Sequence, residues 1–329
     1  MPIPRHTARL LAAAPLLLAP VLELPPDRTT DRSTDRSTGR QPQVDSRAAL
    51  LVTPTWLAEH LRDPDLVLLH VGDKAEYDRA HLPGARYVSM RDVSVSSMDH
   101  ANGLMLELPS PDSLRAQLQA LGISDRSRVV VYYGNDWVSP ATRIVFTLDH
   151  AGLGARTSLL DGGMSAWSAA GHPTTAEVPA RTVGKLSPLR TRPLVVDAEY
   201  VKAHVNAPGS RVIDARAAVF YDGVEGNDAR RGHVAGARSL PFTQVTDDRM
   251  RLRSAEELTA LFRAAGVGPR DTVVAYCHIG QQATAVLFAA RTLGHPVRLF
   301  DGSYQEWGRR PELPVENPAA RGASGSAKP

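Results

Sequence analysis

The sequence predicts an α/β protein of two related domains, each a central, mainly parallel sheet flanked by helices. Two observations predict this fold class. Apolar runs with the length of buried strands alternate along the chain with helical stretches, which is typical of parallel sheets. The same succession of segments also occurs twice, and a length of 329 residues suits two domains with extensions.

The first 45 residues lie outside the repeated pattern. Arg5 and Arg9 precede an apolar stretch, residues 10–22, that is too short to span a bilayer and is typical of a signal peptide. Residues 27–38 form three Asp-Arg tetrads with nothing apolar to bury, which indicates a disordered linker. We therefore expect residues 1–45 to direct export to the periplasm, without a stable membrane anchor. A misassigned start codon, and so a cytoplasmic protein, is the alternative.

Matching segments define the two copies as residues 46–180 and 196–316. The matches are 80–86 with 232–238, 114–122 with 258–266, 129–133 with 272–276, 141–142 with 283–284, and 160–167 with 300–307. Between the copies we expect a linker over residues 181–195. The Gly-, Ala- and Ser-rich residues 317–329 are expected to form a disordered tail.

Cys277 is the only cysteine of the chain, and it follows a predicted strand over residues 272–276. A predicted helix over residues 283–293 comes after it, so the cysteine opens a strand–loop–helix junction. Such a junction directs several backbone N–H groups and the positive end of a helix towards one point. We expect a reactive thiolate there. The alternative is a small buried hydrophobic residue.

The loop after this cysteine is polar and contains one glycine. It consists of His278, Ile279, Gly280, Gln281 and Gln282. We expect Gly280 to supply a backbone angle that other residues rarely adopt. The two glutamines are expected to contribute their backbone N–H groups. Alignment of Tyr133 with Tyr276 places Gly134 where Cys277 stands, so the first copy keeps the scaffold and lacks the nucleophile.

Four motifs in order resemble the tandem-domain rhodanese family of sulfurtransferases, over roughly residues 50–316. They are Asp214-Ala215-Arg216, the His-x-x-Gly-Ala-Arg segment that begins at His233, the Cys-x-x-Gly loop at Cys277 and the Asp-Gly-x-x-x-Glu-Trp segment that ends at Trp307. The resemblance implies an inactive N-terminal domain, a catalytic C-terminal domain and an active site near their interface.

The resemblance also implies a reaction. Cys277 takes the sulfane sulfur of thiosulfate, becomes a persulfide and passes the sulfur to cyanide or a thiol. The backbone N–H groups of the loop stabilise the thiolate and persulfide anions. The donor 3-mercaptopyruvate is the alternative. Ile279 stands where thiosulfate-type loops carry a cation and mercaptopyruvate-type loops carry a serine that is part of a relay. The acidic residue of that relay would lie near His70, so the sequence carries the loop signature of neither donor. We favour thiosulfate because an exported enzyme meets inorganic donors.

The resemblance implies supporting roles for three further side chains. Arg216 matches the family arginine that binds the anionic donor, since a guanidinium suits a sulfonate or carboxylate; a structural salt bridge is the alternative. His278 is expected to favour the thiolate, unless it faces solvent. Trp307 is expected to pack in the domain, with pocket lining as the alternative.

Composition limits the partners. One cysteine and eleven scattered histidines give no metal-binding spacing, so we expect no metal or organic cofactor. The net charge is +3, and no basic run is interleaved with aromatic residues, which argues against nucleic acid. We expect a monomer whose partners are a small sulfur donor and a thiol or cyanide acceptor.

Two rival functions belong to other classes. A phosphatase or arsenate reductase holds its oxyanion on a Cys-x5-Arg loop, and Ala283 stands where that arginine is needed. A non-catalytic persulfide carrier would hold sulfur on Cys277 and pass it only to a dedicated partner. Turnover with small acceptors distinguishes the carrier, which stops after one equivalent, from an enzyme.

Overall fold

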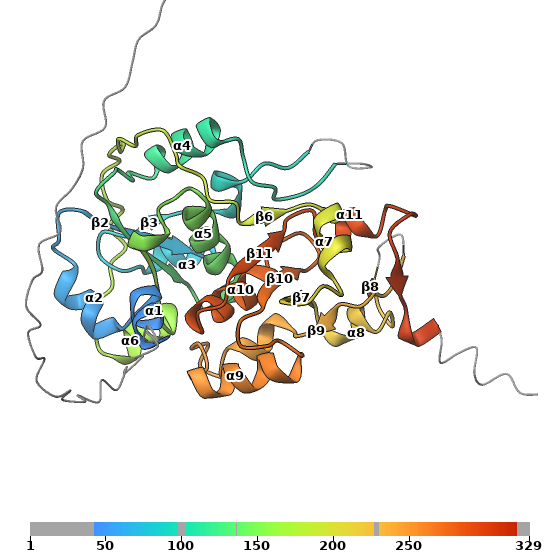
Figure 1. Cartoon of the computed structure of the whole chain (residues 1–329). Helices are drawn as coiled ribbons and strands as arrows, with labels where there is room; N and C mark the ends of the chain where they lie inside the picture. Colours follow the sequence, from blue (N-terminus) through green and yellow to red (C-terminus); the bar gives the residue numbers. More distant parts are fainter. Residues whose placement is uncertain (1–42, 98–102, 136, 227–229, 321–329) are drawn as a thin grey trace, which may run out of the picture. The chain divides into compact units, whose positions relative to one another are not determined.

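The computed structural model describes residues 43–97, 103–135, 137–226 and 230–320, with side chains from residue 47 onwards. Each repeat contains a five-stranded sheet in which every strand pair is parallel (Figure 1). The strand order is β1-β5-β4-β2-β3 in the N-terminal repeat and β6-β11-β10-β7-β9 in the C-terminal one. The predicted fold class is therefore confirmed. Both repeats lie in one compact unit.

The N-terminal repeat alternates strands with helices. Its strands are β1 (Leu51–Val52), β2 (Leu66–Val71), β3 (Arg86–Tyr87), β4 (Arg128–Tyr133) and β5 (Thr157–Leu160); its helices are α1 (Gln43–Leu50), α2 (Pro54–His60), α3 (Lys74–Arg79), α4 (Pro111–Ala120), α5 (Val138–His150) and α6 (Gly163–Ala169), with 3₁₀ turns η1 (Met90–Val93) and η2 (Gly154–Arg156).

The C-terminal repeat follows the same plan. Its sheet strands are β6 (Val195–Val196), β7 (Ser210–Asp214), β9 (Arg238–Ser239), β10 (Thr272–Tyr276) and β11 (Val297–Phe300); β8 (His233–Val234) pairs antiparallel with β12 (Val315–Glu316); the helices are α7 (Ala198–His204), α8 (Ala218–Tyr221), α9 (Ala255–Ala264), α10 (Ala283–Thr292) and α11 (Ser303–Trp307), with the 3₁₀ turn η3 (Phe242–Val245).

Local sequence signals explain where these elements begin. Strands β4 and β10 are Val- and Tyr-rich and buried on both faces, as central strands of a covered parallel sheet are. Ser110 caps α4, whose first residue is a proline. Ser254 and Glu257 form a capping box at the start of α9.

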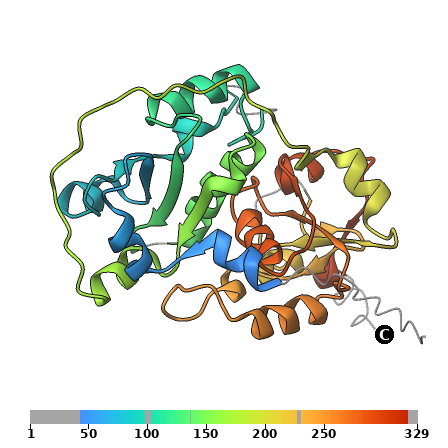
Figure 2. The same cartoon turned by 60° about the vertical axis from the view of Figure 1, so that its left-hand side comes forward.

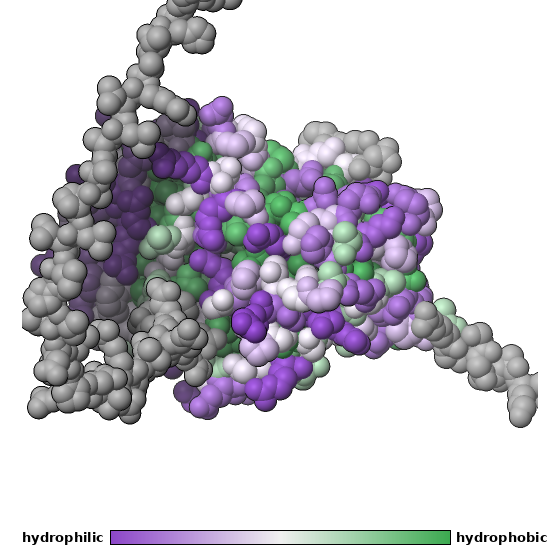
Figure 3. All heavy atoms as spheres, viewed as in Figure 1, coloured by the Kyte–Doolittle hydropathy of each residue, from purple (hydrophilic) through white to green (hydrophobic). Residues whose placement is uncertain are grey.

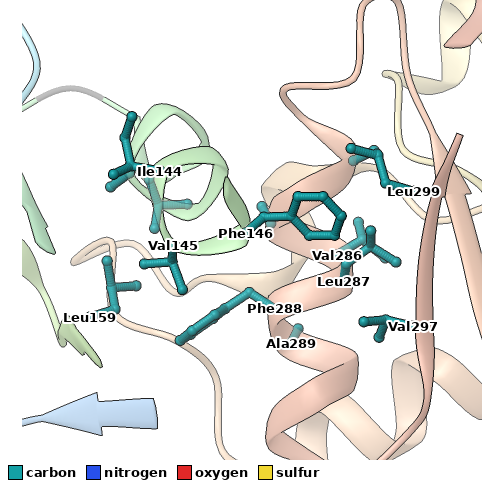
Figure 4. Close-up of a cluster of buried hydrophobic side chains, with 14 of the residues drawn as sticks. Ile144, Val145, Phe146, Leu159, Val286, Leu287, Phe288, Ala289, Val297 and Leu299 are labelled. Atoms are coloured by element: carbon teal, nitrogen blue, oxygen red, sulfur yellow. The ribbon is translucent and has the colours of Figure 1, made fainter. Parts of the chain in front are cut away.

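Helices α5 and α10 form the contact between the repeats. Both are buried along nearly their whole length, because each packs on its own sheet and on the other helix. Figure 4 shows a reciprocal arrangement of two phenylalanines at equivalent positions. Phe146 of α5 points towards Val286 of the C-terminal repeat, and Phe288 of α10 points towards Leu159 of the N-terminal repeat. The two repeats thus share one hydrophobic core.

The segments outside the repeats depart in part from the predicted boundaries. Helix α1 begins at Gln43, inside the predicted leader and linker; residues 1–42 lie outside the described residues. Residues 171–194 connect the repeats with no helix or strand except an isolated bridge at Thr175, and contain most of the predicted linker (Figure 2). The start of the predicted disordered tail is structured, because Ala319 N donates to Asp222 O at 2.9 Å.

The surface in view is mixed. Figure 3 shows hydrophilic residues interspersed with smaller hydrophobic areas, as expected when the apolar helices are covered. Within the described ranges, the helices are all too short or too polar to traverse a bilayer.

Candidate active site

Cys277 lies at the carboxyl end of β10, the central strand of the C-terminal sheet. It is 1% exposed. The strand before it is held on one side by β7, where Tyr276 is in register with Asp214, and on the other by β11. The Cys277 amide donates to Ser303 Oγ at 3.2 Å. Burial alone fits both a reactive thiol and an inert one, so the loop geometry decides what this cysteine is suited to do.

The carbonyl groups of the loop face outward. Five carbonyls of residues 277–282 accept hydrogen bonds. The bonds run from Tyr304 N to Cys277 O at 3.0 Å, from Gln305 N to His278 O at 3.0 Å, from Arg143 Nη1 to Gly280 O at 3.1 Å, from Thr284 Oγ1 to Gln281 O at 2.6 Å and from Ala285 N to Gln282 O at 3.1 Å.

The amide groups of the same loop are not used in this way. In the described part of the chain, the N–H groups of residues 279–282 have no protein acceptor. A trans peptide directs its C=O and the following N–H in opposite directions, so the bound carbonyls of residues 278, 280 and 281 turn the amides of residues 279, 281 and 282 to the other side of the loop. Unpaired amides before a helix N-terminus form an anion-binding cradle. This geometry supports the predicted loop function.

Gly280 is required at its position for two reasons. Its φ of +80° lies in the left-handed region that favours glycine. A Cβ added there would also lie 2.7 Å from Asp301 Oδ1 and 2.9 Å from Arg143 Nη1. Any side chain would therefore push the loop away from this ion pair.

Arg143 reaches the loop from helix α5 of the N-terminal repeat. Its Nη1 lies 2.6 Å from Asp301 Oδ1, and the arginine and aspartate side chains are 1% and 9% exposed. The family motifs in the sequence do not include this residue. The available signal was the match of Arg143 with Ala285, when Ala141-Thr142 is aligned with Ala283-Thr284.

Ser303 is a second residue at the site that was not among the predicted site residues. It is fully buried, and its φ of +52° is uncommon for a residue other than glycine. Its hydroxyl donates to Phe300 O at 2.9 Å and accepts the Cys277 amide. Gly163, its counterpart in the other repeat, has a φ of +53°. Comparison of Asp161-Gly162-Gly163 with Asp301-Gly302-Ser303 would have identified the exchange.

The remaining loop side chains have distinct surroundings. His278 is half-buried, and its ring meets that of Phe220 of α8 edge-on, with centroids 4.7 Å apart. Gln281 Nε2 donates to Ser139 Oγ of the N-terminal repeat at 3.3 Å. Ile279 and Gln282 are half-buried as well. The loop therefore contacts both repeats.

Arg216 lies in a buried ion pair. Its Nη2 is 2.6 Å from Asp214 Oδ2 and donates to Gly232 O at 2.6 Å, and its guanidinium lies 4.0 Å from the centroid of the Tyr304 ring. Burial disfavours the charged guanidinium, but Asp214 outweighs this effect and raises the pKa of Arg216. Arg216 is 1% exposed, so these contacts match the structural salt bridge that was the alternative to donor binding.

Trp307 lies in the core of the C-terminal repeat. Its side chain is fully buried, its Nε1 donates to Pro314 O at 3.0 Å, and its ring lies edge-on to Phe300. These contacts match packing, not pocket lining.

The equivalent place in the N-terminal repeat holds no thiol. Gly134 follows β4, and its amide donates to Val71 O at 3.1 Å. His70 is in register with Tyr132 as Asp214 is with Tyr276, and the hydroxyls of these two tyrosines accept the equivalent amides of Leu82 and Val234, each at 3.1 Å. The predicted alignment is therefore wrong by one residue, and Tyr133, not Gly134, stands where Cys277 stands. Within the described ranges, no three His, Cys, Asp or Glu side chains are grouped as metal ligands.

A comparison with known protein families identifies both repeats. The Rhodanese-like domain matches residues 53–170 and residues 197–310. The chain belongs to the rhodanese family. Each matched stretch contains four of the five strands of one sheet, so the tandem organisation predicted from the internal repeat is that of the family.

Curated relatives agree with this assignment. The chain is 34% identical to a probable 3-mercaptopyruvate sulfurtransferase of Pseudomonas aeruginosa, over 82% of this chain and 98% of the relative. It is 32% identical to a thiosulfate sulfurtransferase of the same organism, over 83% and 99%. The predicted sulfurtransferase activity is thereby confirmed. A solved structure of an EanB variant with ergothioneine has the same fold, with a TM-score of 0.73 and 22% identity over 83% of this chain and 71% of that one.

Proposed function

We propose that this rhodanese transfers sulfane sulfur from thiosulfate to a thiophilic acceptor through a persulfide on Cys277. The thiolate attacks the outer sulfur of thiosulfate, the S–S bond of the donor breaks, and sulfite leaves with the electron pair. Cyanide or a thiolate then attacks the terminal sulfur of the persulfide. The S–S bond to Cys277 breaks, and the thiolate is restored.

The observation that carries this proposal is the arrangement of the loop after β10. Cys277 opens a loop whose carbonyls are bound from outside and whose amides, over residues 279–282, have no acceptor in the described part of the chain. Such amides stabilise a thiolate, a persulfide and the sulfonate end of a donor without reorganisation. Arg143 and Arg216 are both held in buried ion pairs, so the proposal assigns the donor anion to these backbone groups.

Two donor assays test the proposal. Thiocyanate formation from thiosulfate and cyanide is measured beside pyruvate release from 3-mercaptopyruvate, for the wild type and Cys277→Ser, with the intact mass after exposure to each donor. We expect turnover with thiosulfate and a mass gain of one sulfur atom in the wild type alone. Turnover with 3-mercaptopyruvate only would assign the alternative donor. Absence of both turnover and mass gain would contradict the persulfide mechanism.

The same experiment separates an enzyme from a persulfide carrier. A carrier would gain one sulfur from the donor and stop after one equivalent with cyanide or a small thiol. We expect repeated turnover, because residues of both repeats already contact the loop.

We further propose that the protein is exported and acts as a monomer. The charged start and short apolar stretch of residues 1–22 support export. Cell fractionation and N-terminal sequencing of the mature chain test export, and light scattering tests the monomer. A cytoplasmic protein with an intact N-terminus, or a stable dimer, would contradict these proposals.

A further inference from the structure

Arg143 belongs to the repeat that lacks the cysteine, yet two of its three hydrogen-bond acceptors lie in the catalytic repeat. Its Nη1 donates to Gly280 O at 3.1 Å and to Asp301 Oδ1 at 2.6 Å, and its Nη2 donates to Leu106 O at 2.5 Å. The side chain is 1% exposed. Because the guanidinium is planar and rigid, three acceptors in this arrangement define its position.

The arginine is present on only one side of a pseudo-symmetric interface. In the aligned segments Ala141-Thr142-Arg143 and Ala283-Thr284-Ala285, an alanine takes its place in the C-terminal repeat. The surrounding backbone contacts are kept on both sides. Leu108 N donates to Asp301 Oδ2 and Leu252 N donates to Asp161 Oδ1, both at 3.0 Å. The interface itself therefore does not require an arginine, and the side that has one is the side with Cys277.

The bond to Gly280 O acts on the loop through one peptide plane. The carbonyl of Gly280 and the amide of Gln281 share that plane and point in opposite directions when the peptide is trans. A guanidinium that holds the carbonyl therefore fixes the direction of the Gln281 N–H, which has no acceptor in the described residues. Gly280 at φ +80° has the backbone freedom to rotate away if this bond is lost.

We propose that Arg143 is a positioning residue for the Cys277 loop, supplied by the repeat without a nucleophile. It orients the Gly280–Gln281 peptide so that the amide serves the anion on the cysteine, and it connects this peptide to Asp301 and to Leu106. The inference rests on the proposed role of Cys277. It also gives the N-terminal repeat a role in catalysis beyond covering a hydrophobic face.

The test uses the full chain and three variants. Arg143→Gln removes the charge, and Arg143→Lys keeps the ion pair to Asp301 but lacks the fork that reaches Gly280 O and Leu106 O together. Tyr133→Phe is the matched control, because Tyr133 Oη donates to Met250 O at 2.6 Å on the side without the cysteine. Met250 and Leu106 are equivalent residues with φ of +62° and +57°.

Three readouts are taken at a temperature where each variant is folded by circular dichroism. They are the rate of alkylation of Cys277 by iodoacetamide near neutral pH, the extent of persulfide formation by intact mass, and kcat and KM for sulfur transfer. We expect both Arg143 variants to lose about 10- to 100-fold in alkylation rate and in kcat, with a smaller change in KM. Tyr133→Phe should stay within about two-fold of the wild type.

Alkylation separates the two hypotheses. A wild type that is alkylated rapidly but forms no persulfide would contradict the proposed function and leave the positioning role measurable. Arg143 variants with wild-type alkylation and kcat would overturn the positioning role. So would an equal loss in Tyr133→Phe, or failure of both Arg143 variants to fold while Tyr133→Phe folds, since each indicates a purely structural residue.

Discussion

Thr142 and Thr284 occupy equivalent positions in the two repeats, and their hydroxyl oxygens lie 3.0 Å apart across the interface. Each is 1% exposed at the start of α5 or α10. Each hydroxyl oxygen also lies within hydrogen-bond distance of a carbonyl three residues earlier, that of Ser139 in the first turn of α5 for Thr142 and that of Gln281 in the Cys277 loop for Thr284. Because the two hydroxyls have only two protons, one of them donates to the other threonine while its partner donates to a carbonyl. This pair therefore connects the start of α5 to the cysteine loop across the interface.

This pair predicts coupling between the repeats. Thr142→Val or Thr284→Val alone leaves a buried hydroxyl without its partner and should cost about 1–3 kcal/mol of unfolding free energy. The double variant should cost less than the sum, by about 0.5–1.5 kcal/mol. Urea unfolding of the four proteins measures this coupling. Strictly additive losses would mean that the two hydroxyls do not interact.

Ser303 predicts an unusual order of substitutions. Ser303→Ala keeps the strained φ of +52° and leaves the Cys277 amide buried without an acceptor, at a cost of about 1–3 kcal/mol. Ser303→Gly loses the same bond but relieves about 1–2 kcal/mol of strain. Thermal unfolding should therefore rank the glycine variant above the alanine variant. The opposite order would show that the backbone of this turn is not strained.

Arg216→Lys distinguishes a role in the stability of the fold from a role in binding the sulfur donor. Arg216→Lys keeps the positive charge but loses the double contact with Asp214 and the stacking on Tyr304, and should cost about 2–4 kcal/mol. KM for the donor should change little in the fraction that stays folded. A raised KM at unchanged stability would instead support the donor-binding role implied by the family resemblance.

His70 predicts a loss of stability in mild acid. Burial, together with the nearby His81, lowers its pKa from 6.5 to about 4. Between these values the unfolded chain binds the proton more strongly, so stability present above pH 6.5 is lost as the pH falls to about 4, by about 3 kcal/mol in total.

His70→Phe removes this titration. Both ring nitrogens of His70 lack a partner in the described part of the chain, so an aromatic replacement should be tolerated at neutral pH. The variant should gain in stability relative to the wild type as the pH falls through this window, which urea unfolding at neutral and mildly acidic pH measures. A difference that does not vary with pH would contradict the prediction.

Much of the fold could be read from local pattern. Strand 272–276 and the start of the helix at residue 283 were predicted as they occur, because a Val-rich run after a turn and a Gly-free apolar run are local signals. The internal repeat predicted two domains with one parallel sheet each, as the structure has them. The tail was less well predicted. Its first residues are held by a backbone bond from Ala319 to Asp222, which composition does not reveal.

The sequence by itself determined the tandem α/β architecture, the family and the choice of Cys277 as the candidate nucleophile. These rest on periodicity and on motifs whose spacing along the chain is short. The tertiary structure decided the environment of that cysteine: Arg143 bonded to Gly280 and Asp301, Ser303 beneath the Cys277 amide, and Arg216 in an ion pair with Asp214. The reason is physical. Arg143 reaches the loop because α5 packs against α10, and Ser303 reaches the Cys277 amide because β11 pairs with β10. Arg216 and Asp214 are neighbours in sequence, but only the fold decides that the pair is buried.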